Sequence, residues 1–84
     1  MKKPKKNKWY TFDGPIKPKP NTGGIIGITD MGCLFELFYT KEGEWEEMWV
    51  DEIGKCRWQS IYRTCSDEKG EYKYNPFVKW KIVM

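Results

Sequence analysis

The chain has 84 residues and a formal net charge of +3 at pH 7, with 15 Lys and Arg against 12 Asp and Glu. This length corresponds to one domain at most, and so small a domain needs a dense core. Five Trp, five Tyr and four Phe can supply it, whereas the chain has no Ala and only two Leu. Aromatic residues favour strands, and Ala and Leu favour helices, so the composition predicts a mainly β fold.

The absence of His excludes many kinds of active site. Without imidazole there is no Ser-His or Cys-His nucleophile and no His metal ligand. Cys33, Cys56 and Cys65 cannot complete a Cys₄ zinc site, and no two of them have CxxC spacing. We therefore predict a protein that is not an enzyme and that uses no metal and no other cofactor.

The three thiols are expected to be small, buried or half-buried side chains. A bridge between Cys56 and Cys65 is the alternative, and it would require an oxidising compartment. The sequence shows no apolar signal segment and no apolar run long enough to span a membrane. These features predict a cytoplasmic protein that does not contact membranes.

Two parts are expected along the chain: a basic arm over residues 1–8, which holds five Lys and no acid, and a single aromatic-rich β domain over residues 9–84. Residues 9–12 have the character of a short edge strand. A connection rich in Pro and Gly follows and is expected to be extended. It leads into an apolar strand over residues 25–29, and Gly32 is placed for a tight turn after it.

Residues 33–40 form the most apolar run of the sequence, and it is predicted to be a strand. Alternation divides it into two faces, with Cys33, Phe35, Leu37 and Tyr39 on one and Leu34 and Phe38 beside Glu36 on the other. Because both faces are apolar, the strand is either central in the sheet or has one face that binds a partner.

The segment that follows the next turn fits two structures. As a strand, residues 44–50 alternate regularly; as a helix, residues 44–53 place Trp45, Met48 and Trp49 on one stripe, with Gly54 as a stop. We favour the strand because a three-residue turn joins the segment to the strong strand before it. The short helix remains the alternative.

The rest of the chain also predicts strands. Residues 55–64 alternate except at Ile61, and residues 65–75 form a polar loop or hairpin around Lys69 and Gly70. In the last strand, Val78, Trp80, Ile82 and Met84 share one face, and Lys79 and Lys81 share the other. About five short strands separated by Gly-containing turns are typical of a small antiparallel barrel or sandwich.

An acidic segment in the middle of the chain is the first candidate site. Residues 41–52 carry six acids and one Lys, interleaved with large aromatic residues. Aromatic side chains provide binding energy at protein interfaces, and charges steer the partner. The predicted protein-binding residues are Glu44, Trp45, Glu46, Glu47 and Trp49. In the alternative interpretation these Trp residues fill the core of a solvated hairpin.

The second candidate site is basic and would bind nucleic acid. Its residues are Lys2, Lys3, Lys5, Lys6 and Lys8 of the arm, followed by Lys17 and Lys19, with Arg57, Arg63, Lys79 and Lys81 of the strands. Phosphate backbones attract such patches, and Trp9, Tyr10, Tyr72 and Tyr74 are available to stack on unpaired bases. In the alternative interpretation the arm is a solubilising tail, and the strand lysines prevent edge-to-edge aggregation.

The order of these features resembles the short β domains of unknown function found in bacteriophage and prophage genomes. The resemblance covers residues 9–62 and rests on Trp9, the Pro-rich bend, the aromatic strand, the Gly43-Glu44-Trp45 turn and Trp58. The chain departs from that pattern after Trp58, where a further strand replaces a terminal Pro-rich segment. The resemblance brings no catalytic residues. It implies an accessory phage protein, a class that often blocks host machinery, including defence systems.

Three functional hypotheses follow. In the first, the protein is a non-catalytic, phage-type inhibitor that binds a host protein in the host cytoplasm through the acidic segment. In the second, it is a small nucleic-acid-binding β barrel that uses the basic residues. In the third, it is a virion or assembly component that self-associates through a strand edge. The sequence specifies neither the partner nor the oligomeric state.

Overall fold

The structure is a computed structural model that describes residues 3–84. Met1 and Lys2, the first residues of the predicted arm, lie outside the described residues. Eight strands make up the regular structure of the described chain, and it contains no helix. They are β1 (Tyr10–Thr11), β2 (Thr22–Thr29), β3 (Leu34–Tyr39), β4 (Trp45–Val50), β5 (Cys56–Ser60), β6 (Arg63–Asp67), β7 (Gly70–Tyr74) and β8 (Phe77–Ile82). The predicted mainly β, antiparallel class is confirmed, with eight strands where about five were expected.

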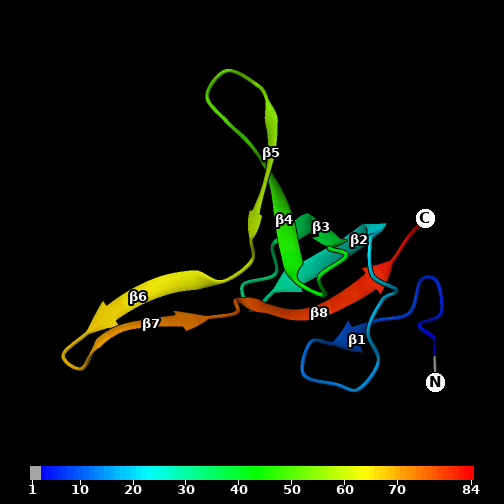
Figure 1. Cartoon of the computed structure of the whole chain (residues 1–84), viewed down its shortest axis with the longest axis horizontal. Coiled ribbons are helices and arrows are strands. Elements are labelled where there is room, and N and C mark those ends of the chain that lie inside the picture. Colours follow the sequence, from blue (N-terminus) through cyan, green and yellow to red (C-terminus); the bar gives the residue numbers. More distant parts are fainter. Residues whose placement is uncertain (1–2) are drawn as a thin grey trace.

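Six of the strands form one antiparallel sheet in the order β1-β8-β2-β3-β4-β5, and β6 and β7 form a separate two-stranded ribbon (Figure 1). β8 is inserted between β1 and β2. The sheet is strongly curled. Strands β2 and β3 lie between β8 and β4, and yet the ring centroids of Trp80 on β8 and Trp45 on β4 are only 5.3 Å apart. Among the described strands it does not close into a barrel, since β1 pairs only with β8 and β5 pairs only with β4.

The core lies on the concave face of this curled sheet. Its buried hydrophobic side chains are Ile25, Leu37, Trp45, Ile61, Phe77 and Trp80. Phe12, just beyond β1, lies 4.8 Å from Trp45 between ring centroids and covers the open side. Gly27 faces this core, where an added Cβ would be 2.5 Å from Leu37 Cδ1, so the packing requires Gly there. Aromatic rings therefore fill most of the core, as the composition predicted.

The ambiguous segment is a strand, and the alternative helix over residues 44–53 does not form. Strand β4 pairs with β3, with Trp45 opposite Tyr39 and Glu47 opposite Leu37. The turn between them uses Gly43 at a φ of 79°, a conformation that favours Gly. The short connection explains the outcome, because it returns the chain directly alongside β3.

The predicted strand over residues 55–64 is divided in two. Strand β5 ends at Ser60, β6 begins at Arg63, and Ile61 between them is fully buried. The chain bends at this point because Ile61 enters the core, and β6 then leaves the sheet. Ile61 was the one residue that interrupted the alternation of the segment, so the sequence contained the signal of the break.

The predicted faces of the last strand need a correction at Val78. A bulge in β8 pairs Lys79 with Ile28 but Phe77 with Thr29, so Val78 is the extra residue. As a result Phe77 and Trp80 are buried, and Val78 is 46% exposed. Met84, which was expected on the same face, lies beyond the strand and is 81% exposed.

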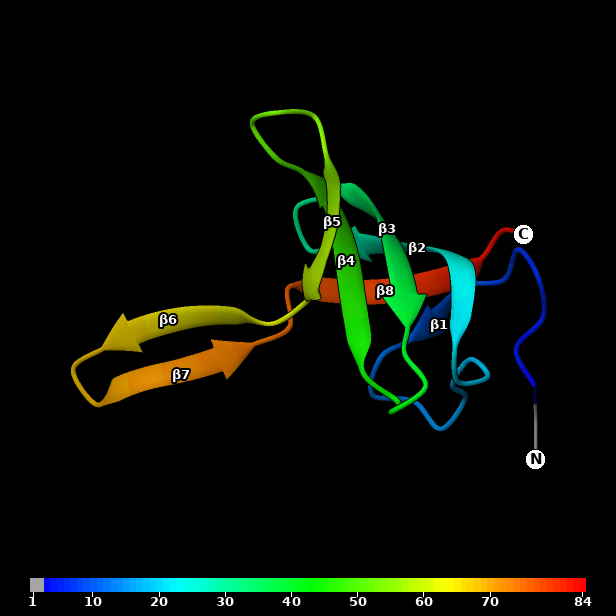
Figure 2. The same cartoon turned by 45° about the horizontal axis from the view of Figure 1, so that its top comes forward.

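Two hairpins project from the curled sheet. The β4–β5 hairpin extends past the sheet with its loop at residues 51–55, and the β6–β7 ribbon leaves in another direction (Figures 1 and 2). The ribbon is the hairpin alternative expected for residues 65–75, and it turns at Gly70 with a φ of 117°. The molecule thus consists of a compact body, formed by the curled sheet and its core, and two hairpins that diverge from it.

Candidate binding surfaces

The predicted acidic contact surface does not form as a unit. Trp45 and Glu47 are only 7% and 2% exposed, because strand alternation turns both onto the concave face. Trp45 packs against Tyr39 with ring centroids 4.8 Å apart. These two residues cannot reach a partner, and the interpretation that the Trp fills the core is the correct one for Trp45.

The other three residues of that predicted surface lie in different places. Glu44 is exposed in the turn before β4, and its N–H donates to Thr40 Oγ1 at 3.0 Å. Glu46 is half-buried and lies beside Phe38 on the convex face of the sheet. Trp49 is 38% exposed and lies on the concave side, in the projecting β4–β5 hairpin. They therefore present no common surface.

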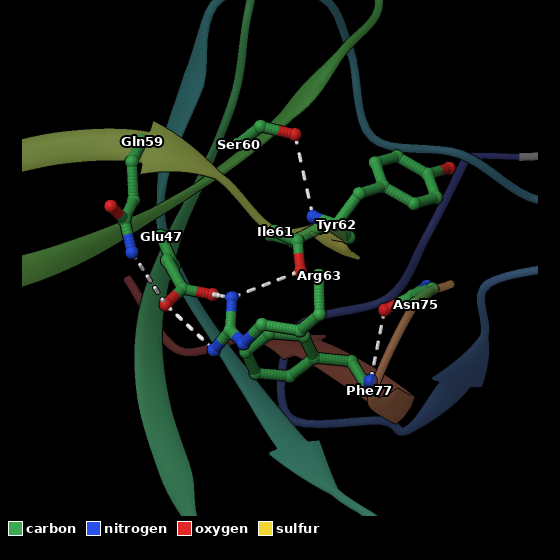
Figure 3. Close-up of polar contacts among 8 residues, drawn as sticks. All are labelled: Glu47, Gln59, Ser60, Ile61, Tyr62, Arg63, Asn75 and Phe77. Carbon is green, nitrogen blue, oxygen red and sulfur yellow. Dashed lines mark hydrogen bonds and ion pairs between the residues drawn. The ribbon is translucent and has the colours of Figure 1, made fainter. Parts of the chain in front are cut away.

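The buried carboxylate of Glu47 instead forms an ion pair with the partly exposed Arg63 (Figure 3). The guanidinium is bidentate: Nη1 donates to Oε2 at 2.8 Å and Nη2 donates to Oε1 at 2.9 Å. Gln59 donates to Oε1 at 3.3 Å, and Nη1 also donates to the carbonyl of Ile61 at 3.1 Å. The pair fixes the start of β6 to β4 across the bend. The nucleic-acid hypothesis required Arg63 to be free to bind a phosphate, and this ion pair occupies its guanidinium instead.

The sequence offered a signal for this pair. The alternation that puts Trp45 in the core also puts Glu47 there, and a buried carboxylate requires a cationic partner. Arg63 follows the one irregular position, Ile61, so the bend brings it back to the same face.

Arg57 also has a structural role, in the loop of the projecting β4–β5 hairpin. Its Nε donates to Asp51 Oδ2 at 2.7 Å, and Asp51 Oδ1 accepts from the N–H groups of Ile53 and Lys55. The Arg57 guanidinium, with these backbone donors, holds the pKa of Asp51 below its ordinary value. Arg57 lies opposite Trp49 on the concave side, so it is not on the same face as Lys79 and Lys81.

The basic arm lies along β8. The N–H of Asn7 donates to the carbonyl of Ile82 at 2.7 Å, and the N–H of Lys5 donates to Tyr10 Oη at 2.8 Å. Lys81 Nζ lies 4.6 Å from the ring centroid of Trp9, within cation–π range. These contacts place residues 7–9 against β8, with Trp9 beside Lys81. Lys8 Nζ lies 5.6 Å from the ring centroid of Tyr10, which packs against Trp80 on the concave side.

The Pro-rich loop adds further lysines to this region. One hollow is lined by Lys3, Lys5, Lys8, Tyr10 and Ile16, and a second by Lys3, Pro4, Pro15, Lys17, Pro18, Lys19 and Pro20. Lys3 belongs to both hollows, so the loop lies next to the arm. We define the basic surface as Lys3, Lys5, Lys6, Lys8, Lys17, Lys19, Lys79 and Lys81, with Trp9 and Tyr10. Asp13 is the one acid within residues 3–20, and residues 77–84 have none.

The convex face of the sheet carries apolar side chains that no second layer formed by residues 3–84 covers. Phe38 and Trp58 lie 5.8 Å apart between ring centroids, and Trp58 and Leu34 are 42% and 60% exposed. This is the second apolar face that the sequence predicted for residues 33–40. Lys79 and Lys81 project on the same side, opposite Ile28 and Ile26 of β2.

All three cysteines are free thiols, so the bridge between Cys56 and Cys65 does not form. Cys33 and Cys56 are exposed, contrary to the expectation of buried or half-buried thiols, and Cys65 is half-buried. Within residues 3–84, no three His, Cys, Asp or Glu side chains gather as a metal site would require. The same residues contain no helix with the length and apolar character needed to cross a membrane. No protein-family model, curated protein or solved structure matches the chain.

Proposed function

We propose that this protein is a non-catalytic nucleic-acid-binding protein that holds single strands on the basic surface. The observation that carries the proposal is the docking of the arm along β8, with Lys81 over the ring of Trp9. This contact brings the arm and β8, which are more than 70 residues apart in sequence, together at the β1 edge of the sheet, so that lysines of both segments lie around that edge.

The chemistry of the surface fits a phosphate backbone and unpaired bases together. Seven of its eight lysines are exposed, and lysines that neutralise phosphates release condensed counterions. Trp9 is 36% exposed at the edge of this surface. Stacking on an aromatic ring requires a base that is not inside a duplex, so we expect preference for single strands.

The phage-type inhibitor of a host protein, including a host defence protein, stays a prediction, but the geometry supports it less. Its expected contact set loses Trp45 and Glu47 to the core, and the remaining three residues are dispersed. The nucleic-acid hypothesis also loses two of its predicted residues, because Arg57 is bound to Asp51 and Arg63 is bound to Glu47. However, Lys3, Lys5 and Lys8 line one hollow, and Lys17 and Lys19 line a second hollow with Lys3.

The test is the salt dependence of binding to a labelled oligonucleotide of about 15 nucleotides, followed by fluorescence anisotropy. The affinity for single strands should fall steeply between about 50 and 200 mM salt. The double variant Lys79→Gln/Lys81→Gln should reduce the steepness of log K against log salt by about 1.4, if each lysine contacts one phosphate. Absence of binding at the lowest salt would overturn the proposal.

A matched control carries the same change of charge elsewhere. Lys69 and Lys73 lie on the β6–β7 ribbon and are exposed, so Lys69→Gln/Lys73→Gln should leave the salt slope unchanged. Replacement of Trp9 by Ala should weaken binding to single strands by about 1–3 kcal/mol through lost stacking. If both double variants change the salt slope equally, net charge alone attracts the oligonucleotide, and the basic surface is not the binding site.

A further inference from the structure

The basic arm folds back before it enters β1. The turn lies at Asn7, whose φ of 63° is a left-handed conformation that Asn adopts more readily than most residues. Hydrogen bonds hold the turn on both sides: the N–H of Asn7 donates to the carbonyl of Ile82, and the N–H of Lys5 donates to Tyr10 Oη. The first described residues of the arm therefore lie beside the start of β1.

This fold of the arm creates a hollow next to β1. The hollow has a volume of about 370 Å³, which is within the range of pockets that hold small ligands. Three segments line it, namely the arm, β1 and the Pro-rich loop (Figure 1). We refer to it as the arm hollow, and its residues are Lys3, Lys5, Lys8, Tyr10 and Ile16.

The charged groups that line the arm hollow, among the described residues, are three lysines and no acid. Two other hollows of the described chain differ in this respect, because Asp51 and Glu52 line one and Glu44 lines the other. Ammonium groups that are held close together repel one another, and an anion between them relieves this repulsion. The arm hollow is therefore suited to an anionic ligand.

A terminal phosphate of a nucleic-acid strand fits this charge better than an internal phosphate does. An internal phosphodiester carries one negative charge, whereas a terminal monoester, with a second pKa of about 6, carries close to two at neutral pH. Tyr10 and Ile16 supply apolar surface in the same hollow, against which the terminal nucleoside can pack. The arm hollow thus combines the groups that a phosphorylated strand end requires.

The second basic hollow gives the rest of such a strand a path. Lys3 lines both hollows, and Lys17 and Lys19 line the second one together with prolines of the loop and the arm. Lys17 Nζ donates to the carbonyl of Phe12, whereas Lys19 is exposed. A strand that ends in the arm hollow can therefore pass Lys3 and bring a following phosphate to Lys19. This continuity favours a strand over a free anion as the occupant.

We propose that the arm hollow binds the phosphorylated end of a single strand, so that the protein recognises strand termini in addition to the strand itself. Lys3, Lys5 and Lys8 contact the terminal phosphate, and the strand runs from there toward the Pro-rich loop. This inference rests on the proposed function, because the rest of the strand is held by the basic surface.

Fluorescence anisotropy with one oligonucleotide in three forms tests the proposal. The oligonucleotide has about 15 nucleotides and a fluorophore on an internal base, and it carries a 5′-phosphate, a 3′-phosphate or hydroxyl groups at both ends. At about pH 7.5, at least one phosphorylated form should bind about fivefold or more tightly than the hydroxyl form, which is the effect of one or two exposed ion pairs. The form that binds more tightly identifies the end that is recognised.

Two variants with the same change of charge locate the site. Lys3→Gln/Lys5→Gln should bind all three forms with equal affinity, and the arm should stay docked because Lys5 holds Tyr10 through its backbone N–H. Lys79→Gln/Lys81→Gln should weaken binding of all three forms and yet keep the preference for the phosphorylated end. If Lys3→Gln/Lys5→Gln keeps this preference, the arm hollow is not the site and the proposal is wrong.

Protonation of the phosphate gives a readout that needs no variant. The preference should largely disappear between about pH 7.5 and pH 5, as the terminal phosphate takes up its second proton. The groups that face it are lysines and Tyr10, and the chain has no His, the side chain that ordinarily titrates in this range. Equal affinity of the three forms at about pH 7.5, with steep salt dependence retained, would overturn this inference and leave the proposed function intact. Absence of binding by every form at the lowest salt would overturn both.

Discussion

The body and the projecting hairpins use the same kinds of residue in opposite ways. In the body, Trp45 and Trp80 are buried and their rings lie 5.3 Å apart. In the hairpins, Trp49, Tyr72 and Tyr74 are between 38% and 49% exposed. An aromatic-rich composition therefore indicates how much ring surface a chain carries, but not which rings form the core and which remain available to a partner.

The largest expected effect comes from the body. Replacement of Trp80 by Ala should destabilise the protein by about 3–5 kcal/mol, because its ring is fully buried and contacts Tyr10 and Trp45. Its indole N–H also donates to the carbonyl of Thr11 at 3.3 Å. Urea denaturation measures the loss. Trp58→Ala, at a 42% exposed ring on the convex face, is the control and should cost much less. Equal losses would contradict the location of the core.

A smaller effect is expected at the junction of body and ribbon. Arg63→Met leaves the buried carboxylate of Glu47 without its charged partner and should cost about 3 kcal/mol, the lower end for buried pairs because Arg63 is partly exposed. Hydrogen exchange should show the amides of β6 and β7 losing protection before those of β2 and β8. A second change, Glu47→Leu, should restore most of the stability. If it does not, the ion pair is not what joins the ribbon to the body.

The smallest effect is expected at the tip of the β4–β5 hairpin. Asp51 has a pKa held below its ordinary 3.8, first by Arg57 and then by backbone donors. A lowered pKa in the folded state means that the contact stabilises the hairpin above about pH 3.8 and that this contribution disappears as the pH falls through the lowered value. Carboxyl ¹³C shifts should show the Asp51 pKa rising in Arg57→Gln. An unchanged value would exclude Arg57 as the cause.

Local pattern predicted most of the strands and turns. The turn at Gly32, the strand at β3 and the final strand were all evident from alternation and from Gly positions, because these features depend on neighbours in sequence. A single residue overrides the pattern at two places. Ile61 enters the core and divides one expected strand, and the bulge at Val78 turns Phe77 onto the core face of β8 while Trp80 stays on the face that alternation predicted.

The candidate sites were less predictable, because they depend on which face of the sheet is covered. Alternation showed that Trp45 and Glu47 share a face, but it did not show that this face is the concave one. Likewise, the contact between Lys81 and Trp9 joins the two ends of the chain, and local pattern carries no information on such a contact. The sequence therefore predicted which side chains share a face of a strand. Only the folded structure shows what each face packs against.

The position of β8 has a consequence for synthesis of the protein. β8 lies between β1 and β2, and it also supplies Trp80 and Phe77 to the core. A nascent chain can form the β2-β3-β4-β5 meander early, since these strands are sequential. However, the edge of β2 stays unpaired on the ribosome until residues 77–82 emerge. Unpaired edges and uncovered apolar surface promote aggregation. We therefore expect yield in cells to depend on the time between translation of β2 and of β8.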